Sequence, residues 1–147
     1  MIALIQRVTE ASVSIDGRKT ASIDHGLLAL IGVEKSDTPD LAAELADKIL
    51  HYRVFSDDSG KMNFDVTQAA GQLLLVPQFT LVADTRKGRR PGFSAGASPA
   101  QGRELFDCLV TSASAQGVPV DTGTFGADMQ VSLVNDGPVT FWLQVGP

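Results

Sequence analysis

The sequence predicts one α+β domain over residues 1–147, with a mostly antiparallel, barrel-like sheet and two main helices packed against it. Short apolar segments rich in β-branched residues recur along the chain, as expected for strands. Two segments begin with a Thr-Pro or Ser-Pro pair, which is typical of the start of a helix. No linker or internal repeat divides the 147 residues, a length that can bury one core.

The first part of the chain is predicted to be β-structure. Four strands are expected, at residues 2–8, 11–15, near 18–23 and 26–33. Asp16-Gly17 is a strong signal for a two-residue hairpin turn between the second and third of them. The apolar run at 26–33 indicates a strand buried on both faces.

Two helices are predicted from their first residues. Thr38 is expected to cap the first helix, with Pro39 at its first position. Its apolar face has four-residue spacing and comprises Leu41, Ala42, Leu45, Ala46, Ile49 and Leu50. Ser98-Pro99 repeats the signal, and this second helix is expected to end near Gly117.

The remaining strands are expected at 52–55, 72–76, 118–120, 129–134 and 139–145, with a basic loop at 83–98. The stretch VNDGPVTFWL, residues 134–143, is unusual because Gly137-Pro138 lies near its middle. Proline donates no hydrogen bond to a sheet, and glycine weakens a strand. Either a turn separates two strands here, or the backbone has a role that side chains cannot fill.

Composition narrows the classes of function. The net charge of −5 is unlike that of a protein that binds duplex nucleic acid by bulk electrostatics, so we expect no DNA partner. A local basic cluster consists of Arg86, Lys87, Arg89 and Arg90. It is either an ordinary solvated loop or a contact for RNA.

The sequence also predicts where the protein works. The longest apolar run, residues 27–33, is far too short to cross a membrane, and the N-terminal stretch has no signal-peptide pattern. A single cysteine, Cys108, suits a reducing compartment and is interpreted as a core thiol. We therefore expect a cytoplasmic protein.

Most catalytic patterns are missing. His25 and His51 have no metal-ligand spacing, and no phosphate-binding or dinucleotide fingerprint occurs, so we predict no metal and no cofactor. Asp57 and Asp58 lie in a Gly/Ser-rich turn, where adjacent carboxylates are usually solvated. Thr80, in PQFTL, is a candidate site residue at a strand end, or simply a threonine that favours β-structure.

Several stretches together resemble the D-aminoacyl-tRNA deacylase family from end to end. They are ALIQRV (3–8), GLLALIGVE (26–34), GKMN (60–63), QFTLVADTRKGRRPGFS (78–94) and FGADMQVSLVNDGPVTFWL (125–143). Of the two motifs that define the family, Asn-x-Gly-Pro-Val-Thr is intact at 135–140. Ser-Gln-Phe-Thr departs by one residue, Pro77 in place of serine. A related deacylase group with relaxed chiral specificity also has proline there and remains an alternative.

The resemblance implies a homodimer and a function. The enzyme would hydrolyse the ester of D-aminoacyl-tRNA, and of glycyl-tRNA mischarged on alanine tRNA, and would spare L-aminoacyl-tRNA. It also implies a cis Gly137-Pro138 bond that reaches into the partner's pocket, where the two carbonyls bind the ammonium group and exclude an L side chain. Arg7 and Asn135 would support this segment.

The resemblance further implies the other site residues. Gln78, Phe79 and Thr80 are the expected catalytic segment, with backbone N–H groups near Phe79 and Thr80 as an oxyanion hole. Phe125, Gly126 and Met129 would hold the terminal adenine, although Phe125 and Met129 also suit core packing. The basic cluster would contact acceptor-stem phosphates.

Two rival classes remain from the sequence. A non-catalytic tRNA-binding domain would keep the basic loop and the pocket but hydrolyse nothing. A structural dimer without a ligand would leave both the basic loop and the Gly-Pro strand without a purpose.

Overall fold

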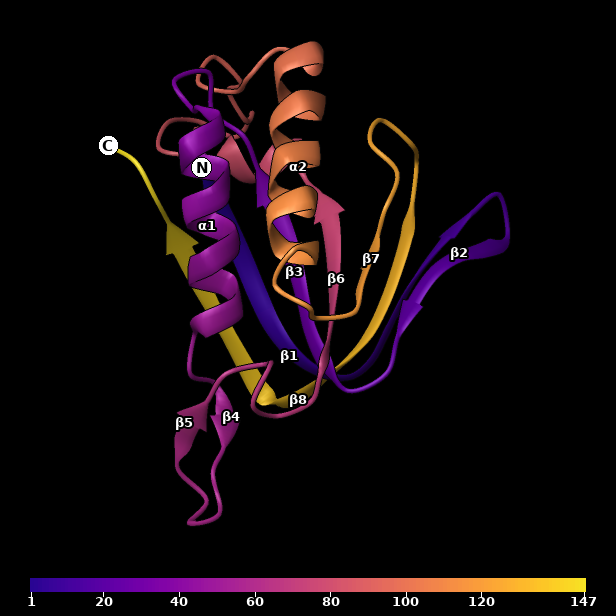
Figure 1. Ribbon diagram of the computed structural model, residues 1–147. Helices are drawn as coiled ribbons and strands as arrows, with labels where there is room; N and C mark the ends of the chain where they lie inside the picture. Colours follow the sequence, from indigo (N-terminus) through magenta and orange to yellow (C-terminus); the bar gives the residue numbers. More distant parts are fainter.

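Two helices cover one face of a six-stranded sheet in the computed structural model, which describes residues 1–147 (Figure 1). The strands are β1 (Ile2–Ile15), β2 (Arg18–Ile23), β3 (Gly26–Gly32), β4 (Phe55–Ser56), β5 (Met62–Phe64), β6 (Gln72–Pro77), β7 (Val120–Thr122) and β8 (Gln130–Gln144). The helices are α1 (Pro39–His51) and α2 (Pro99–Ser114), and a 3-10 turn, η1 (Phe79–Val82), follows β6.

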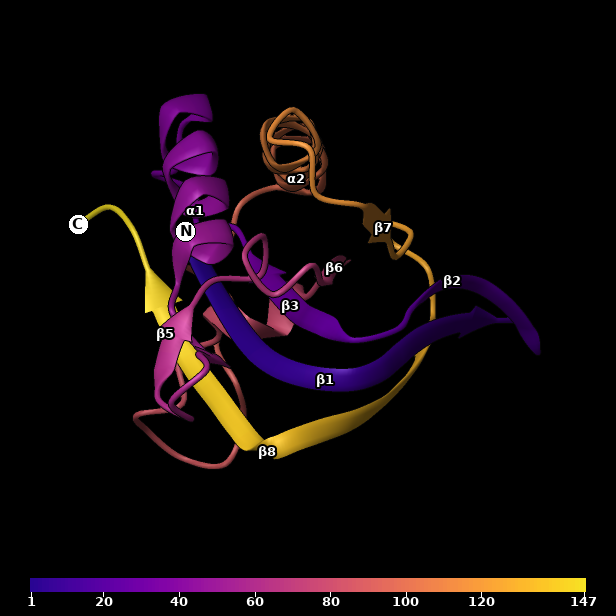
Figure 2. The same cartoon turned by 60° about the horizontal axis from the view of Figure 1, so that its bottom comes forward.

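The sheet curls toward closure. Its strand order is β2-β1-β3-β6-β7, and β8 pairs with β1 outside this path. β1 and β8 bend together through the molecule (Figure 2), and the edge strands approach each other where the Ser22 N–H donates to Asp121 Oδ2 over 2.9 Å. The barrel-like sheet with two packed helices is therefore confirmed.

β1 pairs antiparallel with β2, β3 and β8, whereas the pairs β3–β6 and β6–β7 are parallel. A parallel pair needs a crossover, and α1 and α2 lie in these two connections. The separate hairpin β4–β5 extends away from the sheet (Figure 1).

The sheet has an apolar core on each face, because successive side chains of a strand point to opposite faces. Toward the helices, alternate residues of β3 and β6 join a cluster with α1 and α2. The residues between them, such as Leu28 and Leu74, join a smaller cluster with β1 and β2. We call these the helix core and the strand core.

The predicted caps and the hairpin turn are confirmed. Thr38 Oγ1 accepts from the Leu41 N–H, and Ser98 Oγ accepts from the Gln101 N–H. Asp16 and Gly17 both have positive φ, 51° and 77°, as their turn type requires.

Several predicted boundaries are wrong. β1 and β8 are each continuous rather than split, β4 covers Phe55–Ser56 rather than 52–55, and β7 covers Val120–Thr122 rather than 118–120. β5 and η1 were not predicted. β8 remains one strand because β1 pairs with it on both sides of an irregularity, Gln6 with Thr140 and Val8 with Asn135.

A buried charged pair fixes the start of β1. The Met1 ammonium donates to Asp37 Oδ1 over 2.7 Å and to the Val145 carbonyl over 3.0 Å. Asp37 is only 7% exposed, and its Oδ2 accepts the Glu34 N–H. This carboxylate thus joins β1, the end of the chain and the segment before α1.

Neither helix is long and apolar enough for a membrane span.

Candidate functional site

The segment predicted to be catalytic forms the turn η1 at the end of β6. The Gln78 N–H donates to the Ile31 carbonyl and so continues the pairing of β6 with β3 for one more residue. The turn is closed by bonds from the Leu81 N–H to Gln78 and from the Ala83 N–H to Thr80. The N–H groups of Phe79 and Thr80, at the start of the turn, therefore have no acceptor within it.

The side chains of this segment differ in position. Gln78 Nε2 donates to Thr80 Oγ1, so the threonine hydroxyl is held by its neighbour. Phe79 is 69% exposed and packs on Phe93, with ring centroids 5.5 Å apart. Thr80 is exposed, and the hydrogen bond at its hydroxyl comes from the Gln78 amide rather than from a histidine, lysine or carboxylate that could serve as a base.

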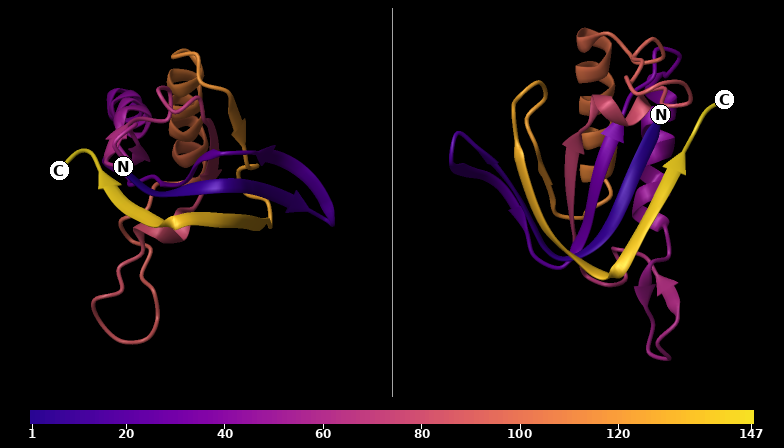
Figure 3. Two further views of the ribbon diagram at one scale, coloured as in Figure 1. Left: turned by 90° about the horizontal axis from the view of Figure 1, so that it is seen from below. Right: turned by 180° about the vertical axis from the view of Figure 1, so that it is seen from behind.

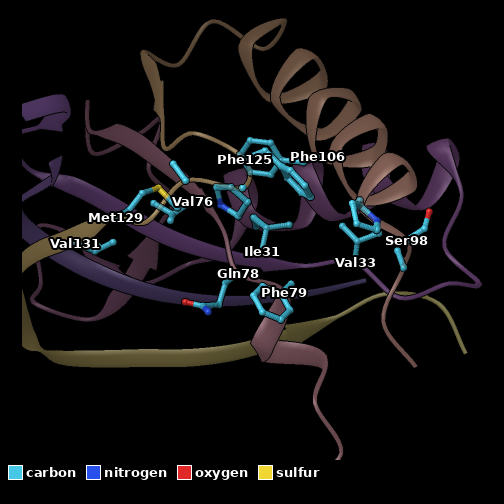
Figure 4. A pocket seen from close by; sticks show the side chains of 16 residues that line it. Ile31, Val33, Val76, Gln78, Phe79, Ser98, Phe106, Phe125, Met129 and Val131 are labelled. Atoms are coloured by element: carbon cyan, nitrogen blue, oxygen red, sulfur yellow. The ribbon is translucent and has the colours of Figure 1, made fainter. Parts of the chain in front are cut away.

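A pocket of about 480 Å³ lies beside η1. Phe79 is on one side of it, Phe125 and Phe106 lie on the opposite side, and Met129 lies near one end (Figure 4). Its remaining lining comes from the ends of β3 and β6, the start of α2, and the loop before β8. Members of both the helix core and the strand core contribute to the walls.

The structure thus brings the predicted catalytic and adenosine-binding residues to one place: Gln78, Phe79, Phe125, Gly126 and Met129 all line this pocket. The Met129 sulfur accepts the Thr124 N–H over 3.4 Å. A Cβ on Gly123 would lie 2.8 Å from that sulfur, so glycine allows Met129 to lie there. Thr80 does not line the pocket.

The Gly137-Pro138 segment forms a bend in β8. Residues 136–139 lie opposite Arg7 alone, and the Gly137–Pro138 peptide bond is cis. Gly137 has φ 136°, and a Cβ there would lie 2.7 Å from Val139 Cγ2 and 3.0 Å from the Val139 nitrogen. This backbone therefore has room for glycine only.

The two predicted supporting residues contact the bend. Arg7 Nε donates to the Asp136 carbonyl over 3.1 Å, and Nη1 donates to the Val54 carbonyl over 2.7 Å. Asn135 Oδ1 accepts the Val139 N–H over 3.0 Å, and Nδ2 donates to Thr140 Oγ1 over 2.9 Å. These hydrogen bonds hold the backbone on both sides of the bend.

Within one chain the bend and the pocket are separated. Arg7, opposite the bend, pairs with Leu27 of β3, whereas Pro77, beside η1, pairs with Ile31. Four positions along β3 are about 13 Å. β3 and β1 also lie between β6 and β8. The bend is visible near the middle of β8, at the lowest point of the strand (Figure 3, right). The basic loop extends from the sheet on the side away from the helices (Figure 3, left).

The predicted phosphate-binding cluster lies on this loop, which is closed by two backbone hydrogen bonds between Asp84 and Gly92. Arg86 differs from the other members because Nε and Nη2 donate to both Asp84 oxygens, over 2.9 and 2.7 Å. These hydrogen bonds hold the pKa of Asp84 well below its usual range and raise the pKa of Arg86. Lys87, Arg89 and Arg90 are exposed.

Other candidates from the sequence lie away from this site. Cys108 is partly buried and packs against the helix core. Asp57 accepts hydrogen bonds from Ser59 and the Lys61 N–H, and the Ser59 hydroxyl is the main cause of its lowered pKa. It therefore stabilises a turn. No group of three or more His, Cys, Asp or Glu side chains gathers as a metal site would require.

The sequence reasoning missed the pocket wall that α2 contributes. Ser98, Pro99, Gly102 and Phe106 all line the pocket. The Ser98-Pro99 signal predicted where this helix begins, but it could not show that the first turns of the helix border a cavity.

Comparisons with known proteins place this geometry in a class. A sequence description of the family "D-Tyr-tRNA(Tyr) deacylase" matches residues 4–144. The D-aminoacyl-tRNA deacylases of Erwinia tasmaniensis and Aeromonas hydrophila are each 59% identical over 145 residues, which cover 99% of this chain and 100% of each relative.

Solved structures agree on the fold. A protein named c-Myc DNA Unwinding Element Binding Protein superposes with a TM-score of 0.95 at 35% identity, with 100% of both chains covered. A probable eukaryotic D-amino acid tRNA deacylase superposes with a TM-score of 0.83 over 98% of both chains. At 16% identity, the latter shows the fold alone.

The protein is a hydrolase that acts on the ester bond of aminoacyl-tRNA. The chain belongs to the D-Tyr-tRNA(Tyr) deacylase family, and its function is that of a D-aminoacyl-tRNA deacylase. The two rival classes from the sequence, a non-catalytic tRNA-binding domain and a structural dimer, are therefore wrong.

Proposed function

We propose that this deacylase works as a homodimer in which the Gly137-Pro138 bend of one subunit completes the pocket of the other. There it admits D-aminoacyl and glycyl esters and rejects L esters. The observation that carries the proposal is the separation of the exposed bend from the pocket within one chain. A bend that tests the substrate at η1 must come from a second copy.

The outer surface of β8 supports this assembly. β8 pairs only with β1, so its other edge is open. The exposed large apolar side chains of β8 are Val134, Phe141 and Trp142, of which Trp142 is 52% exposed. Open strand edges and exposed large apolar side chains are often covered in the working molecule. A second copy would cover both, with the bend at the interface.

The proposed discrimination is steric. The Gly137 and Pro138 carbonyls would accept hydrogen bonds from the substrate ammonium and fill the space that an L side chain needs. Backbone atoms suit this task because they cannot rotate away as side chains can. Glycine has no side chain to exclude, so glycyl-tRNA mischarged on alanine tRNA is expected to be hydrolysed as well.

For the hydrolysis itself, we propose that water attacks the ester carbonyl and that the Phe79 and Thr80 N–H groups stabilise the oxyanion. One such donor contributes about 3 kcal/mol to transition-state stabilisation. The departing ribose oxygen takes up a proton, and the neighbouring 2′-hydroxyl of the terminal ribose helps to activate the water. Thr80, held by Gln78, positions the turn rather than attacking the ester.

The terminal adenine would occupy the apolar pocket, between Phe125 and Met129. An aromatic ring and a polarisable thioether offer stacking surfaces for an unpaired base. Gly126 has φ 80° and open space around its α-carbon, so it turns the chain at the edge of this site.

The test of the proposal is hydrolysis of matched D-tyrosyl-, L-tyrosyl- and glycyl-tRNA by the purified protein. We expect rapid release of D-tyrosine and glycine while the L ester persists. Loss of the L ester at a similar rate would contradict the chiral filter and place this chain with the relaxed-specificity deacylases, which share the proline at position 77. Sedimentation in the same buffer should give the mass of a dimer.

We also propose that Lys87, Arg89 and Arg90 contact acceptor-stem phosphates, while Arg86 shapes the loop through Asp84. Arg89→Gln combined with Arg90→Gln should weaken tRNA binding and reduce the slope of log affinity against log salt by up to about two. Filter binding between 50 and 300 mM salt measures this slope. The matched control is Arg18→Gln, in the distant β1–β2 hairpin. An unchanged slope in the double variant would contradict the contact.

The remaining expectations concern compartment and partners. We propose that the protein acts in the cytoplasm, where aminoacyl-tRNA is its substrate. The name of the 35% identical solved structure mentions DNA binding, and this name describes that protein only. With a net charge of −5 we expect duplex DNA to compete poorly with tRNA.

A further inference from the structure

One cation lies close to the pocket without lining it. Arg103, in the second turn of α2, has its guanidinium carbon 5.0 Å from the centroid of the Phe125 ring. Phe125 lines the pocket, and its ring tip packs so tightly on Gly102 that a Cβ there would lie 3.1 Å from Cζ. Gly102 thus allows the Phe125 ring to lie against α2, where the guanidinium of Arg103 lies over the face of the ring.

The Arg103 guanidinium is available for a ligand. Arg103 is exposed, and no carboxylate or carbonyl of the chain accepts a hydrogen bond from it. By contrast, the guanidinium groups of Arg7 and Arg86 are engaged with β8 and Asp84. A guanidinium stacked on a ring keeps the N–H groups at its edge free, and the stacking reduces its conformational freedom.

The proposed substrate has a matching group. An adenosine in this pocket is the last nucleotide of a polynucleotide, so its 5′-phosphate must leave at the mouth of the pocket. A diester phosphate keeps its negative charge at neutral pH, and the planar guanidinium fork binds phosphate oxygens in pairs. A cation fixed on the ring that stacks the base is well placed for the phosphate of the same nucleotide.

We propose that Arg103 binds the phosphate that joins the terminal adenosine to the preceding nucleotide. The inference rests on the proposed adenosine site and adds a contact to the phosphate beside that adenosine. With this contact the enzyme would prefer an ester at the end of a polynucleotide to the same ester on a free nucleoside. Arg103 would thereby distinguish the end of an RNA chain from small aminoacyl esters.

The test uses two non-hydrolysable probes, both with D-tyrosine in amide linkage to 3′-amino-3′-deoxyadenosine. One carries a 5′-methyl phosphate diester and the other a free 5′-hydroxyl. In calorimetric titrations we expect the wild type to bind the phosphorylated probe about tenfold more tightly, as for a charge-assisted contact. Arg103→Gln should bind both probes as the wild type binds the unphosphorylated one. Arg103→Lys should keep part of the difference, and Arg18→Gln, the charge control, should keep all of it.

The possible results separate the alternatives. If Arg103→Gln weakens both probes equally, the arginine acts only through Phe125 and the phosphate contact is wrong. The contact is equally wrong if this variant retains the tenfold preference. If the wild type binds neither probe, the proposed adenosine site is wrong. The Arg103 contact, which rests on that site, is then wrong as well.

Discussion

Gly137→Ala is expected to lower kcat/KM for D-tyrosyl-tRNA by about a hundredfold or more, the loss that a misplacement of about 1 Å can cause in an active site. The added Cβ would lie 2.7 Å from Val139 Cγ2 and 3.3 Å from Arg7 Nη2, at a φ of 136° that L residues rarely adopt. The bend must shift to accommodate it, and the carbonyls proposed to face the partner's pocket shift with it. Single-turnover deacylation measures the effect.

A matched control distinguishes the effect of moving the bend from the effect of placing alanine at a positive φ. Gly17 also has positive φ, and nothing lies within 4 Å of a Cβ added there. Gly17→Ala should therefore lose some stability and keep its activity. Circular dichroism and sedimentation of both variants establish that each folds and assembles. A folded, dimeric Gly137→Ala protein with normal kcat/KM would contradict the proposed role of the bend.

Asp37→Ala is expected to lower the free energy of unfolding by about 3–5 kcal/mol, as for removal of one partner of a buried ion pair. The substitution leaves the Met1 ammonium with Val145 and a longer contact of 3.7 Å to Glu34, and it frees the Glu34 N–H. Urea denaturation followed by tryptophan fluorescence measures the change, with the slope m compared between variants.

The control for this prediction is Asp58→Asn. Asp58 is exposed in the turn between β4 and β5, so its substitution should change stability by less than about 0.5 kcal/mol. A loss below 1 kcal/mol for Asp37→Ala would show that the buried pair contributes little. Activity at low denaturant should stay near that of the wild type, because Asp37 does not line the pocket.

The features that sequence predicted well are local ones. Thr38 and Ser98 cap helices because their hydroxyls accept N–H groups three residues later, an interaction that a few neighbouring residues determine. Asp16-Gly17 defines its turn because few dipeptides tolerate positive φ at both positions. The buried face of α1 also follows from its four-residue spacing, and the buried strands β3 and β6 follow from their short apolar runs.

The features that sequence could not predict depend on distant partners. β8 continues through Gly137 and Pro138 because β1 pairs with it on either side of Arg7. β3 and β6 are parallel because the connection that contains α1 brings the chain back to the end of the sheet where β3 begins. Neither long-range pairing leaves a signal in a short window of residues.

The site was predicted from family motifs rather than from chemical patterns. The structure brings Phe79 of one motif to Phe125 of another across the pocket, which no spacing in the sequence indicates. It also distinguishes Arg86 from its basic neighbours through Asp84, two residues earlier. That contact has an identifiable sequence signal, because an Asp two residues before an Arg can form an Asx-type turn.

The pocket also has a consequence for the energetics of the whole fold. Its walls include residues of both the helix core and the strand core, so a ligand in it contacts side chains that belong to the two faces of the sheet. A base that fills the pocket would bury apolar surface from both clusters at once, and ligand at about a hundred times its dissociation constant adds about 2.7 kcal/mol to stability. The unfolding transition of the enzyme should therefore move to higher temperature when substrate analogues occupy the pocket.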